Sequence, residues 1–241
     1  MRGILLVARR DFWAYINTAW GWFILAATLL LNGVLFNAMS LGSAPKYSAE
    51  VLESFFQNTG GFALVTSVLI TMRLFAEERQ TGTIVLLESS PLTEMQVVAG
   101  KYLSAMAYLL LLLVCTLYMP ALIFVNGKVS PEEIAAGYFG VLLLGSAGVA
   151  IGTWASALSR NQLLAAVISA VVVVFFVACW MLARVVDPPF KAFISYIAFF
   201  DRQFAGFQEG RINTESVVFF VSITFAFLLM ATRSLISRRW E

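Results

Sequence analysis

Six long apolar stretches constrain this chain more than any other feature of its sequence. The hydrocarbon core of a bilayer is about 30 Å thick, so a helix that rises about 1.5 Å per residue needs roughly 20 apolar residues to cross it. Stretches of this kind cover residues 20–41, 60–76, 102–124, 134–158, 163–186 and 217–236. The connections between them are too short for a soluble domain. We therefore predict an all-α integral membrane protein with six transmembrane helices, forming one domain over residues 1–241.

The same stretches exclude a β-barrel. Barrel strands alternate apolar and polar residues over about ten positions, whereas residues 163–182 are apolar on every side and carry no charge. Hydrophobic residues make up 60% of the chain and charged residues 12%, against about 25% charged in soluble domains. The composition therefore excludes a soluble protein as well.

The residue types that catalysis and metal binding need are largely missing. The chain has no histidine, and both cysteines, Cys115 and Cys179, fall inside predicted spans. It has no Gly-x-x-x-x-Gly-Lys-Ser/Thr loop for a nucleotide phosphate, and its lysines lie at span ends or in connections. We predict that the chain is not an enzyme by itself and that it binds no metal, cofactor or nucleic acid.

Basic residues predict the orientation in the membrane. With both termini in the cytoplasm, 10 of the 16 Lys and Arg residues lie on the inner side and 6 on the outer side. Short connections with more Lys and Arg tend to stay in the cytoplasm. The count favours cytoplasmic termini, and it places the connection over residues 77–101 in the cytoplasm.

This connection carries the most internal pattern. Gly82 is expected to break the helix that leaves the membrane, and Ser90-Pro91 to end a short apolar helix that follows. Thr93 and Gln96 form a capping-box pattern that starts the next helix. A short apolar helix on the water side of a membrane protein favours a docking element for a partner.

Four motifs in this connection resemble a known family. Glu77-Glu78-Arg79, Gly82-Thr83, Ser90-Pro91 and Gly100-Lys101 are similar in order and spacing to the cytoplasmic coupling loop of ABC-2-type exporter permeases, most of all to the gliding-motility-type permeases. The close resemblance covers about 25 residues and a weaker one most of the chain. Val85 stands where such chains often carry an acidic residue.

The resemblance implies a set of residues that contact an ATPase. Val85, Leu86 and Leu87 would insert into a groove of the ATPase, while Glu78 and Arg79 would set the register by charge. The whole set is Glu77, Glu78, Arg79, Gly82, Thr83, Val85, Leu86, Leu87 and Glu88.

The resemblance also implies partners and a location. Two ABC ATPase subunits would bind ATP and Mg, and a second permease copy or a related permease would complete the pathway. The family allows an accessory outer-face protein, and it places the chain among the lipids of the bacterial cytoplasmic membrane. The implied function is the membrane-spanning permease subunit of an ATP-driven exporter. The alternative is a non-transporting scaffold in a gliding or envelope-assembly machine.

Residues 1–18 are predicted to form an interfacial helix, which the resemblance identifies as an elbow helix. Its apolar residues are expected to share one side, with its charged residues facing water. The apolar set is Ile4, Leu5, Phe12, Trp13 and Ile16, and the charged set is Arg2, Arg9 and Asp11. Residues 42–58 are then expected to form an outer loop.

Residues 187–214 are too polar to cross the membrane and too apolar to lie in water. We expect short re-entrant or surface helices there, before the last span. The resemblance implies an outer gate made by Phe193, Ile197, Phe200, Phe204 and Phe207. An amphipathic lid without a gating role is the alternative.

Small and hydroxyl side chains recur within the spans. Gly148 and Gly152 let another helix approach closely, either within one subunit or across a dimer. Hydroxyl groups are predicted to line a path for a bulky amphipathic or lipid-linked cargo. They belong to Thr66, Ser67, Thr71, Ser104, Thr116, Ser146, Thr153 and Ser169.

Overall fold

The computed structural model describes residues 2–41, 47–84, 92–126, 129–186 and 190–238. These residues form helices and connecting turns, with no strand among them. The helices are α1 (Arg2–Asn17), α2 (Ala19–Leu35), α3 (Ser48–Thr71), α4 (Ala76–Gln80), α6 (Glu94–Thr116), α7 (Tyr118–Asn126), α8 (Pro131–Leu158), α9 (Gln162–Val185), α10 (Phe190–Ile197), α11 (Phe204–Gln208) and α12 (Thr214–Arg238). Two π-helical segments, η1 (Phe36–Leu41) and η2 (Phe199–Gln203), follow α2 and α10.

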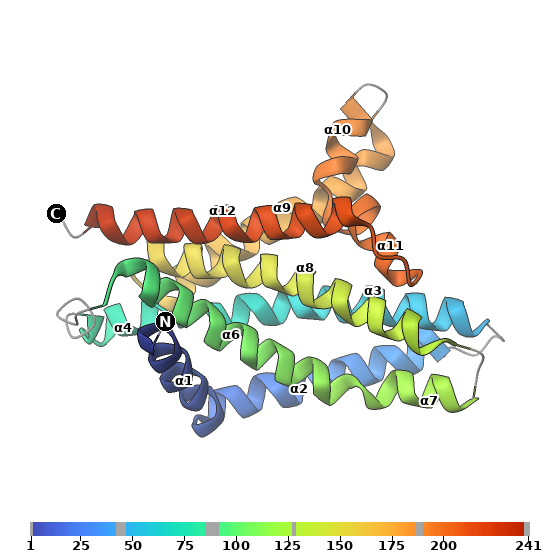
Figure 1. Cartoon of the computed structure of the whole chain (residues 1–241), viewed down its shortest axis with the longest axis horizontal. Coiled ribbons are helices and arrows are strands. Elements are labelled where there is room, and N and C mark those ends of the chain that lie inside the picture. Colours follow the sequence, from blue (N-terminus) through green and yellow to red (C-terminus); the bar gives the residue numbers. More distant parts are fainter. Residues whose placement is uncertain (1, 42–46, 85–91, 127–128, 187–189, 239–241) are drawn as a thin grey trace.

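Six segments are long and apolar enough to cross a membrane, which confirms the predicted fold class. They are Ala19–Met39, Ser48–Gln80, Glu94–Val125, Pro131–Leu158, Gln162–Val185 and Thr214–Ser237. Figure 1 shows them running along the long axis of the molecule. The start of α1, α4 and the end of α12 lie at one end, which we call the α4 end. The opposite end carries α7 and α11, and we call it the α7 end.

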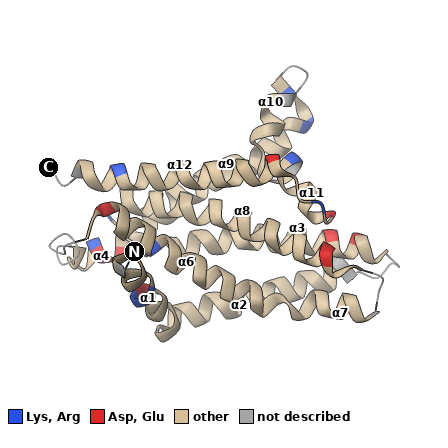
Figure 2. Ribbon diagram, in the orientation of Figure 1, with Lys and Arg blue, Asp and Glu red and all other residues tan. Residues whose placement is uncertain are grey.

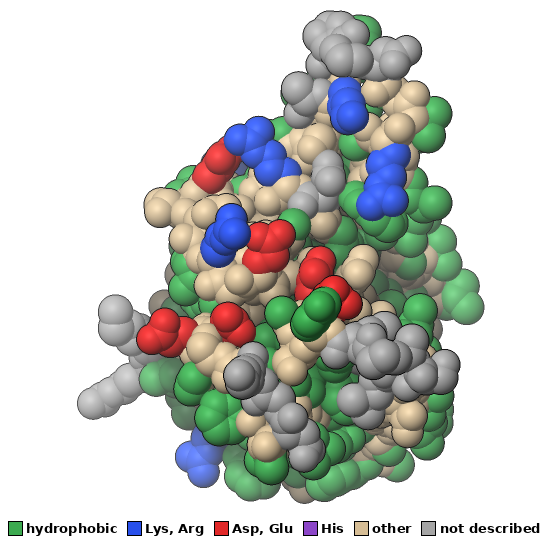
Figure 3. All heavy atoms as spheres, turned by 90° about the vertical axis from the view of Figure 1, so that its right-hand side faces the viewer, with side chains coloured by type: hydrophobic (Ala, Val, Ile, Leu, Met, Phe, Trp, Pro, Cys, Tyr) green, Lys and Arg blue, Asp and Glu red, His purple; other side chains and the backbone are tan. Residues whose placement is uncertain are grey.

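Charged side chains gather at the two ends of the bundle. Figure 2 shows the middle of the long helices free of Lys, Arg, Asp and Glu wherever the ribbon is described. Figure 3 looks onto the α7 end, where acidic and basic side chains are both exposed. An apolar belt between two charged ends is what a bilayer requires of a helical bundle.

Helix α8 forms the centre of the bundle. Within its most apolar window 72% of the residues are buried inside the chain, against 17% for α12. A side-chain carbon at Gly148 or Gly152 would overlap the hydroxyl of Ser67 or Thr71 on α3. The glycines therefore let α3 and α8 touch within one subunit, one of the two arrangements that the sequence left open.

The prediction of an outer loop over residues 42–58 is wrong from Ser48 onward. Helix α3 already begins there, and it buries Val51, Leu52 and Phe55 in the core. Glu50 and Glu53 point outward from the same turns. Apolar residues at helical spacing let one face pack although the stretch as a whole is too polar for a hydropathy window.

The third span is interrupted near Pro120. Helix α6 ends at Thr116, and α7 begins at Tyr118. Proline has no N–H group for the helix ladder, so it accounts for a break within the preceding turn. The Thr116 hydroxyl donates to Leu113 O at 2.7 Å and lies 3.1 Å from the Tyr138 hydroxyl, so the break is partly bridged to α8.

Three short helical segments, α10, η2 and α11, precede the last span. The end of α9 and α10 form a hairpin that projects from the bundle (Figure 1). Phe193 on α10 is 67% exposed, while Phe204 and Phe207 on α11 are fully buried. The Phe207 side chain lies directly against Gly140 of α8, so α11 is part of the core.

The eight hydroxyl residues predicted to line a path do not line one within this chain. All eight are buried, and most donate to a carbonyl oxygen of their own helix, as Ser67 does to Leu64 at 2.6 Å. Thr66 instead pairs with the Thr28 hydroxyl of α2 at 3.1 Å. Their hydrogen-bonding groups are thus occupied by the fold of the single chain.

Candidate functional site

Four charged side chains form a closed ring at the α4 end. Arg10 Nε lies 2.8 Å from Asp11 Oδ1, and Arg10 Nη2 lies 3.0 Å from Glu78 Oε1. Lys101 Nζ lies 3.2 Å from Asp11 Oδ2 and 2.9 Å from Glu78 Oε1. Each cation therefore contacts both anions. The ring joins three elements, because Arg10 and Asp11 belong to α1, Glu78 to α4 and Lys101 to α6.

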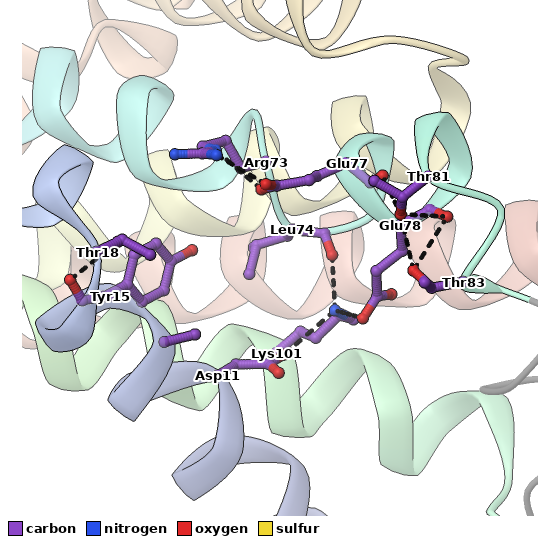
Figure 4. Close-up of a pocket in the computed structure, with 11 residues that line it drawn as sticks. Asp11, Tyr15, Thr18, Arg73, Leu74, Glu77, Glu78, Thr81, Thr83 and Lys101 are labelled. Carbon is purple, nitrogen blue, oxygen red and sulfur yellow. Dashed lines mark hydrogen bonds and ion pairs between the residues drawn. The ribbon is translucent and has the colours of Figure 1, made fainter.

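Lys101 is the most deeply buried member of the ring. Its side chain is 2% exposed, and besides the two carboxylates its ammonium donates to Leu74 O at 2.6 Å. Figure 4 shows it reaching from α6 toward Leu74 and Glu78. The carbonyl groups at a helix end lack partners within the helix, so Lys101 also satisfies the chain where α3 gives way to α4. A buried ammonium with three oxygen partners is held in one place.

Two charged residues of the predicted interfacial helix lie elsewhere than expected. Arg9 shares the exposed side with Leu5 and Trp13 instead of lying opposite them. Asp11 was expected to face water, but its side chain is only 13% exposed and turns inward to Lys101. Helix α1 approaches α6 closely because residue 100 is a glycine: a side-chain carbon there would lie 2.7 Å from Val7 Cβ. The Gly100-Lys101 motif thus combines a close helix contact with the charge that binds α1.

The Arg10 guanidinium and the Tyr15 phenol, both on α1, have raised pKa values. Burial acts against the charged form of Arg10, but its hydrogen bond to Asp11 and the nearby carboxylates outweigh this and raise the pKa of the guanidinium. Burial raises the pKa of Tyr15 well above its usual value. The phenol therefore stays neutral and donates to Ile70 O of α3 at 2.9 Å.

Helix α4 is fastened to α8 as well. The Ser156 hydroxyl accepts hydrogen bonds from the backbone N–H groups of Phe75 at 3.0 Å and of Ala76 at 3.2 Å. Arg79 Nη1 donates to Ser159 O at 2.8 Å. The sequence predicted that the helix of the second span would break at Gly82. The regular helix α3 already ends at Thr71, because these contacts hold the chain in a turn between α3 and α4. Polar groups from α8 and α6 satisfy the backbone of the intervening turn.

The chain leaves α4 through a tight turn. Gly82 has a φ of 73°, a left-handed conformation that glycine adopts without strain, so it does end the helical segment as predicted. The hydroxyls of Thr81 and Thr83 lie 2.9 Å apart, and Thr81 donates to Glu77 O at 3.0 Å. Val85, Leu86, Leu87 and Glu88 lie outside the described residues.

A cavity of about 310 Å³ opens beside the ring. Figure 4 shows Thr18 between α1 and α2, Glu77 on α4 and Thr83 on the turn around it. Arg73 and Glu77, four residues apart in the sequence, form an ion pair on its wall, with Arg73 Nη2 and Glu77 Oε1 2.7 Å apart. Among the described residues no group of three His, Cys, Asp or Glu side chains could hold a metal ion.

The contacts of the site join helices to one another. Each of its four charged side chains pairs with at least one other, although Glu78 Oε2 is buried without a hydrogen-bond partner among the described residues. What the contacts do is fix α4, the base of the 82–92 connection, to α1, α6 and α8.

The comparison with known families agrees with this arrangement. The profile of the ABC-2 family transporter proteins matches residues 7–235, nearly the whole chain. The chain belongs to the ABC-2 transporter family. It is accordingly a multi-pass membrane protein and a permease component of an ABC transporter, a class that normally works with ABC ATPase subunits. No curated individual protein matches it.

In this ABC-2 family protein the five residues predicted as an outer gate do not form one cluster. The Phe200 and Phe204 rings are in contact, with centroids 5.6 Å apart, and Phe207 contacts Phe139 of α8. Ile197 is partly buried near the end of α10, and Phe193 faces outward. The segment joins an exposed hairpin to a buried anchor.

Sequence reasoning missed three residues that fix α4 in this ABC-2 protein. The sequence placed Asp11 on a water-facing surface and Lys101 at the end of a loop. It gave no role to Ser156. One signal was available for Lys101, because it lies about two turns inside a helix with a clear capping box at Thr93. The partners of Asp11 and Ser156 lie 90 and 81 residues away, beyond any local pattern.

Proposed function

We propose that this chain is the permease subunit of an ATP-driven exporter, in which separate ATPase subunits act on the connection over residues 77–101, which we call the coupling segment. The observation that carries the proposal is the double attachment of α4. It is bound to α1 and α6 through the charge ring, and to α8 through Ser156 and Arg79. Helix α4 leads directly into the connection that an ATPase would contact.

The attachment supports a mechanism. Closure of the ATPases on ATP and Mg, which they and not this chain would bind, displaces the 82–92 connection. Helix α4 is too short and too firmly bonded to absorb the displacement, so α3, α6 and α8 move with it as stiff rods. The outer segment with Phe193, Ile197, Phe200, Phe204 and Phe207 then separates at the α7 end.

The pathway forms between two permeases. Helices α9 and α12 bury only 22% and 17% of their most apolar windows within the chain. A second copy or a related permease covers part of this surface, and lipid covers the rest. Two ATPases lie beneath them at the α4 end, which faces the cytoplasm of a bacterium together with both termini. An accessory protein at the outer face is compatible with this assembly.

Val85, Leu86 and Leu87 supply the apolar contact with the ATPase, and Glu88 stands near the place where such chains often carry an acid. Glu77, Glu78, Arg79, Gly82 and Thr83 form the base of this contact. Because Glu78 and Arg79 are already bonded within the chain, their main role is to hold the base in position.

Affinity purification tests the proposal. Wild-type chain extracted from its native membrane is expected to retain an ABC ATPase, identified by mass spectrometry, and the Leu86→Asp, Leu87→Asp double variant to lose it. Asn161→Asp is the control, since it adds a negative charge at the same end while an aspartate can still cap α9. Absence of an ATPase from the wild-type sample in several detergents would sink the proposal.

Transport measurements address the finer assignment. Cargo flux into vesicles that carry the complex is expected to require ATP. A complex that hydrolyses ATP without moving cargo would instead favour the scaffold of a gliding or envelope-assembly machine. The likeness to gliding-motility-type permeases stays a prediction.

A further inference from the structure

Helix α1 presents one face to its surroundings that contains basic and apolar residues but no acid. Leu5, Leu6 and Trp13 are 65%, 69% and 50% exposed, and Arg9 is exposed between them. These residues lie at spacings of three, four and seven, and so share one side of the helix. The only acid of α1, Asp11, is on the opposite side, inside the ring.

This combination matches an anionic membrane surface. Leucine and tryptophan enter the boundary between headgroups and acyl chains, and arginines bind the phosphates. Three large apolar side chains on one face are unfavourable in water. An acidic side chain among the arginines would repel anionic lipid, and this face has none. The face is therefore complementary to anionic phospholipid in both polarity and charge.

Arg10 connects this face to the ring. Its side chain is 56% exposed although Nε and Nη2 contact Asp11 and Glu78. The rest of the guanidinium faces outward, so a lipid phosphate can bind it without displacing either carboxylate. A contact on the exposed side of α1 thereby reaches the group that fixes the coupling segment.

We propose that α1 binds anionic phospholipids of the inner leaflet through Arg9, Arg10 and its exposed apolar residues, and that the bound lipid keeps the charge ring closed. The inference rests on the proposed function only in placing the α4 end on the cytoplasmic side. When lipid holds α1 in place, Asp11 stays on Lys101. When α1 lifts from the bundle, Lys101 becomes accessible. The anionic lipid content of the membrane thus regulates how firmly the coupling segment is attached.

The accessibility of Lys101 measures this directly. The full chain is reconstituted in vesicles of phosphatidylcholine, or of phosphatidylcholine with about one phosphatidylglycerol in four. A neutral amine-acetylating reagent is added, and mass spectrometry gives the labelling rate of Lys101 relative to exposed Lys191 on α10. In the wild type we expect the ratio to be lower in the anionic vesicles. No ATPase is present, so failure here leaves the ATPase purification result untouched.

Substitutions identify the surface responsible. Arg9 lies on the lipid-binding face but outside the ring, and one basic residue at an anionic membrane contributes about fivefold in binding. Arg9→Gln is therefore expected to raise Lys101 labelling about fivefold in anionic vesicles and to leave it unchanged in neutral ones. Arg9→Lys should behave as the wild type, which excludes a folding defect.

Arg160→Gln is the matched control, because it removes an exposed arginine from the same end of the molecule but from the turn after α8. It is expected to have no effect on Lys101. Equal Lys101 labelling of the wild type in both membranes would overturn the proposal. That result is expected if a protein partner, rather than lipid, covers α1. An effect of Arg160→Gln as large as that of Arg9→Gln would overturn it too.

Discussion

At the scale of single residues, the protein depends on charges that satisfy one another away from water. Lys101 is almost fully buried, and its cost of desolvation is offset only because two carboxylates and a carbonyl oxygen surround it. Arg10 contacts the same carboxylates from the solvent side. The ring is therefore sensitive to loss of any one charge, and most sensitive at Lys101.

Lys101→Met is expected to destabilise the protein by about 3 kcal/mol, because it leaves Asp11 and Glu78 with one cation between them in a partly buried site. Denaturant unfolding of the chain in detergent measures this. Adding Asp11→Asn should recover part of the loss, since it removes the uncompensated charge. Lys191→Met, at an exposed lysine, should change little. A Lys101→Met variant as stable as the Lys191→Met variant would contradict the importance of the ring.

Ser156→Ala is expected to cost about 1–3 kcal/mol, because the N–H groups of Phe75 and Ala76 lose their acceptor in a buried turn. Hydrogen exchange of the residue 75–80 amides should speed up in this variant. Ser159→Ala is the matched control, since the Ser159 hydroxyl donates only to Ala155 O in its own helix. Equal exchange in the two variants would mean that Ser156 does not hold α4.

At the scale of helices, close packing of α3 on α8 forms the rigid centre of the bundle. Small residues on α8 lie against Ser67 and Thr71, and a capping box at Ser130, with Pro131 in the first turn, forms its start. The same helix binds α4 through Ser156. Helix α8 therefore connects the coupling segment to α11 at the far end, where Phe207 lies against Gly140.

Gly152→Ala is expected to force α3 and α8 apart, because the added carbon would overlap the Thr71 side chain. Overpacking of this kind costs about 1–3 kcal/mol and should lower the thermal unfolding temperature. Gly61→Ala on α3 meets open space, so it should be neutral or slightly stabilising through its helix propensity. Unchanged unfolding of the Gly152→Ala protein would show that the two helices tolerate a wider separation.

At the scale of the whole molecule, the start of α1, α4 and the end of α12 lie at one end of the bundle (Figure 1). The α7 end carries the outer segment and the start of α8. Six spans require this arrangement, since an even number returns the chain to the side on which it began. Which side that is follows from the basic residues and needs an experiment.

Single cysteines test the orientation. In a chain with Cys115→Ser and Cys179→Ala, a Thr83→Cys thiol is expected to react with a membrane-impermeant maleimide only after the cytoplasmic side is opened. An Asn213→Cys thiol should react in intact cells, because it precedes α12 at the opposite end. The reverse pattern would place the coupling segment outside the cell and exclude the proposed contact with ATPases.

Local patterns determined the six spans, the caps at Thr93 and Ser130, the turn at Gly82 and the pair of Arg73 with Glu77. In each case the deciding interaction is with the bilayer or with residues a few positions away, so the amino-acid order alone is sufficient. The early start of α3 and the inward turn of Asp11 were decided by tertiary structure. A partly polar helix or a carboxylate is stable in the interior only if a distant segment covers or neutralises it, as the buried partners of α3 and Lys101 do.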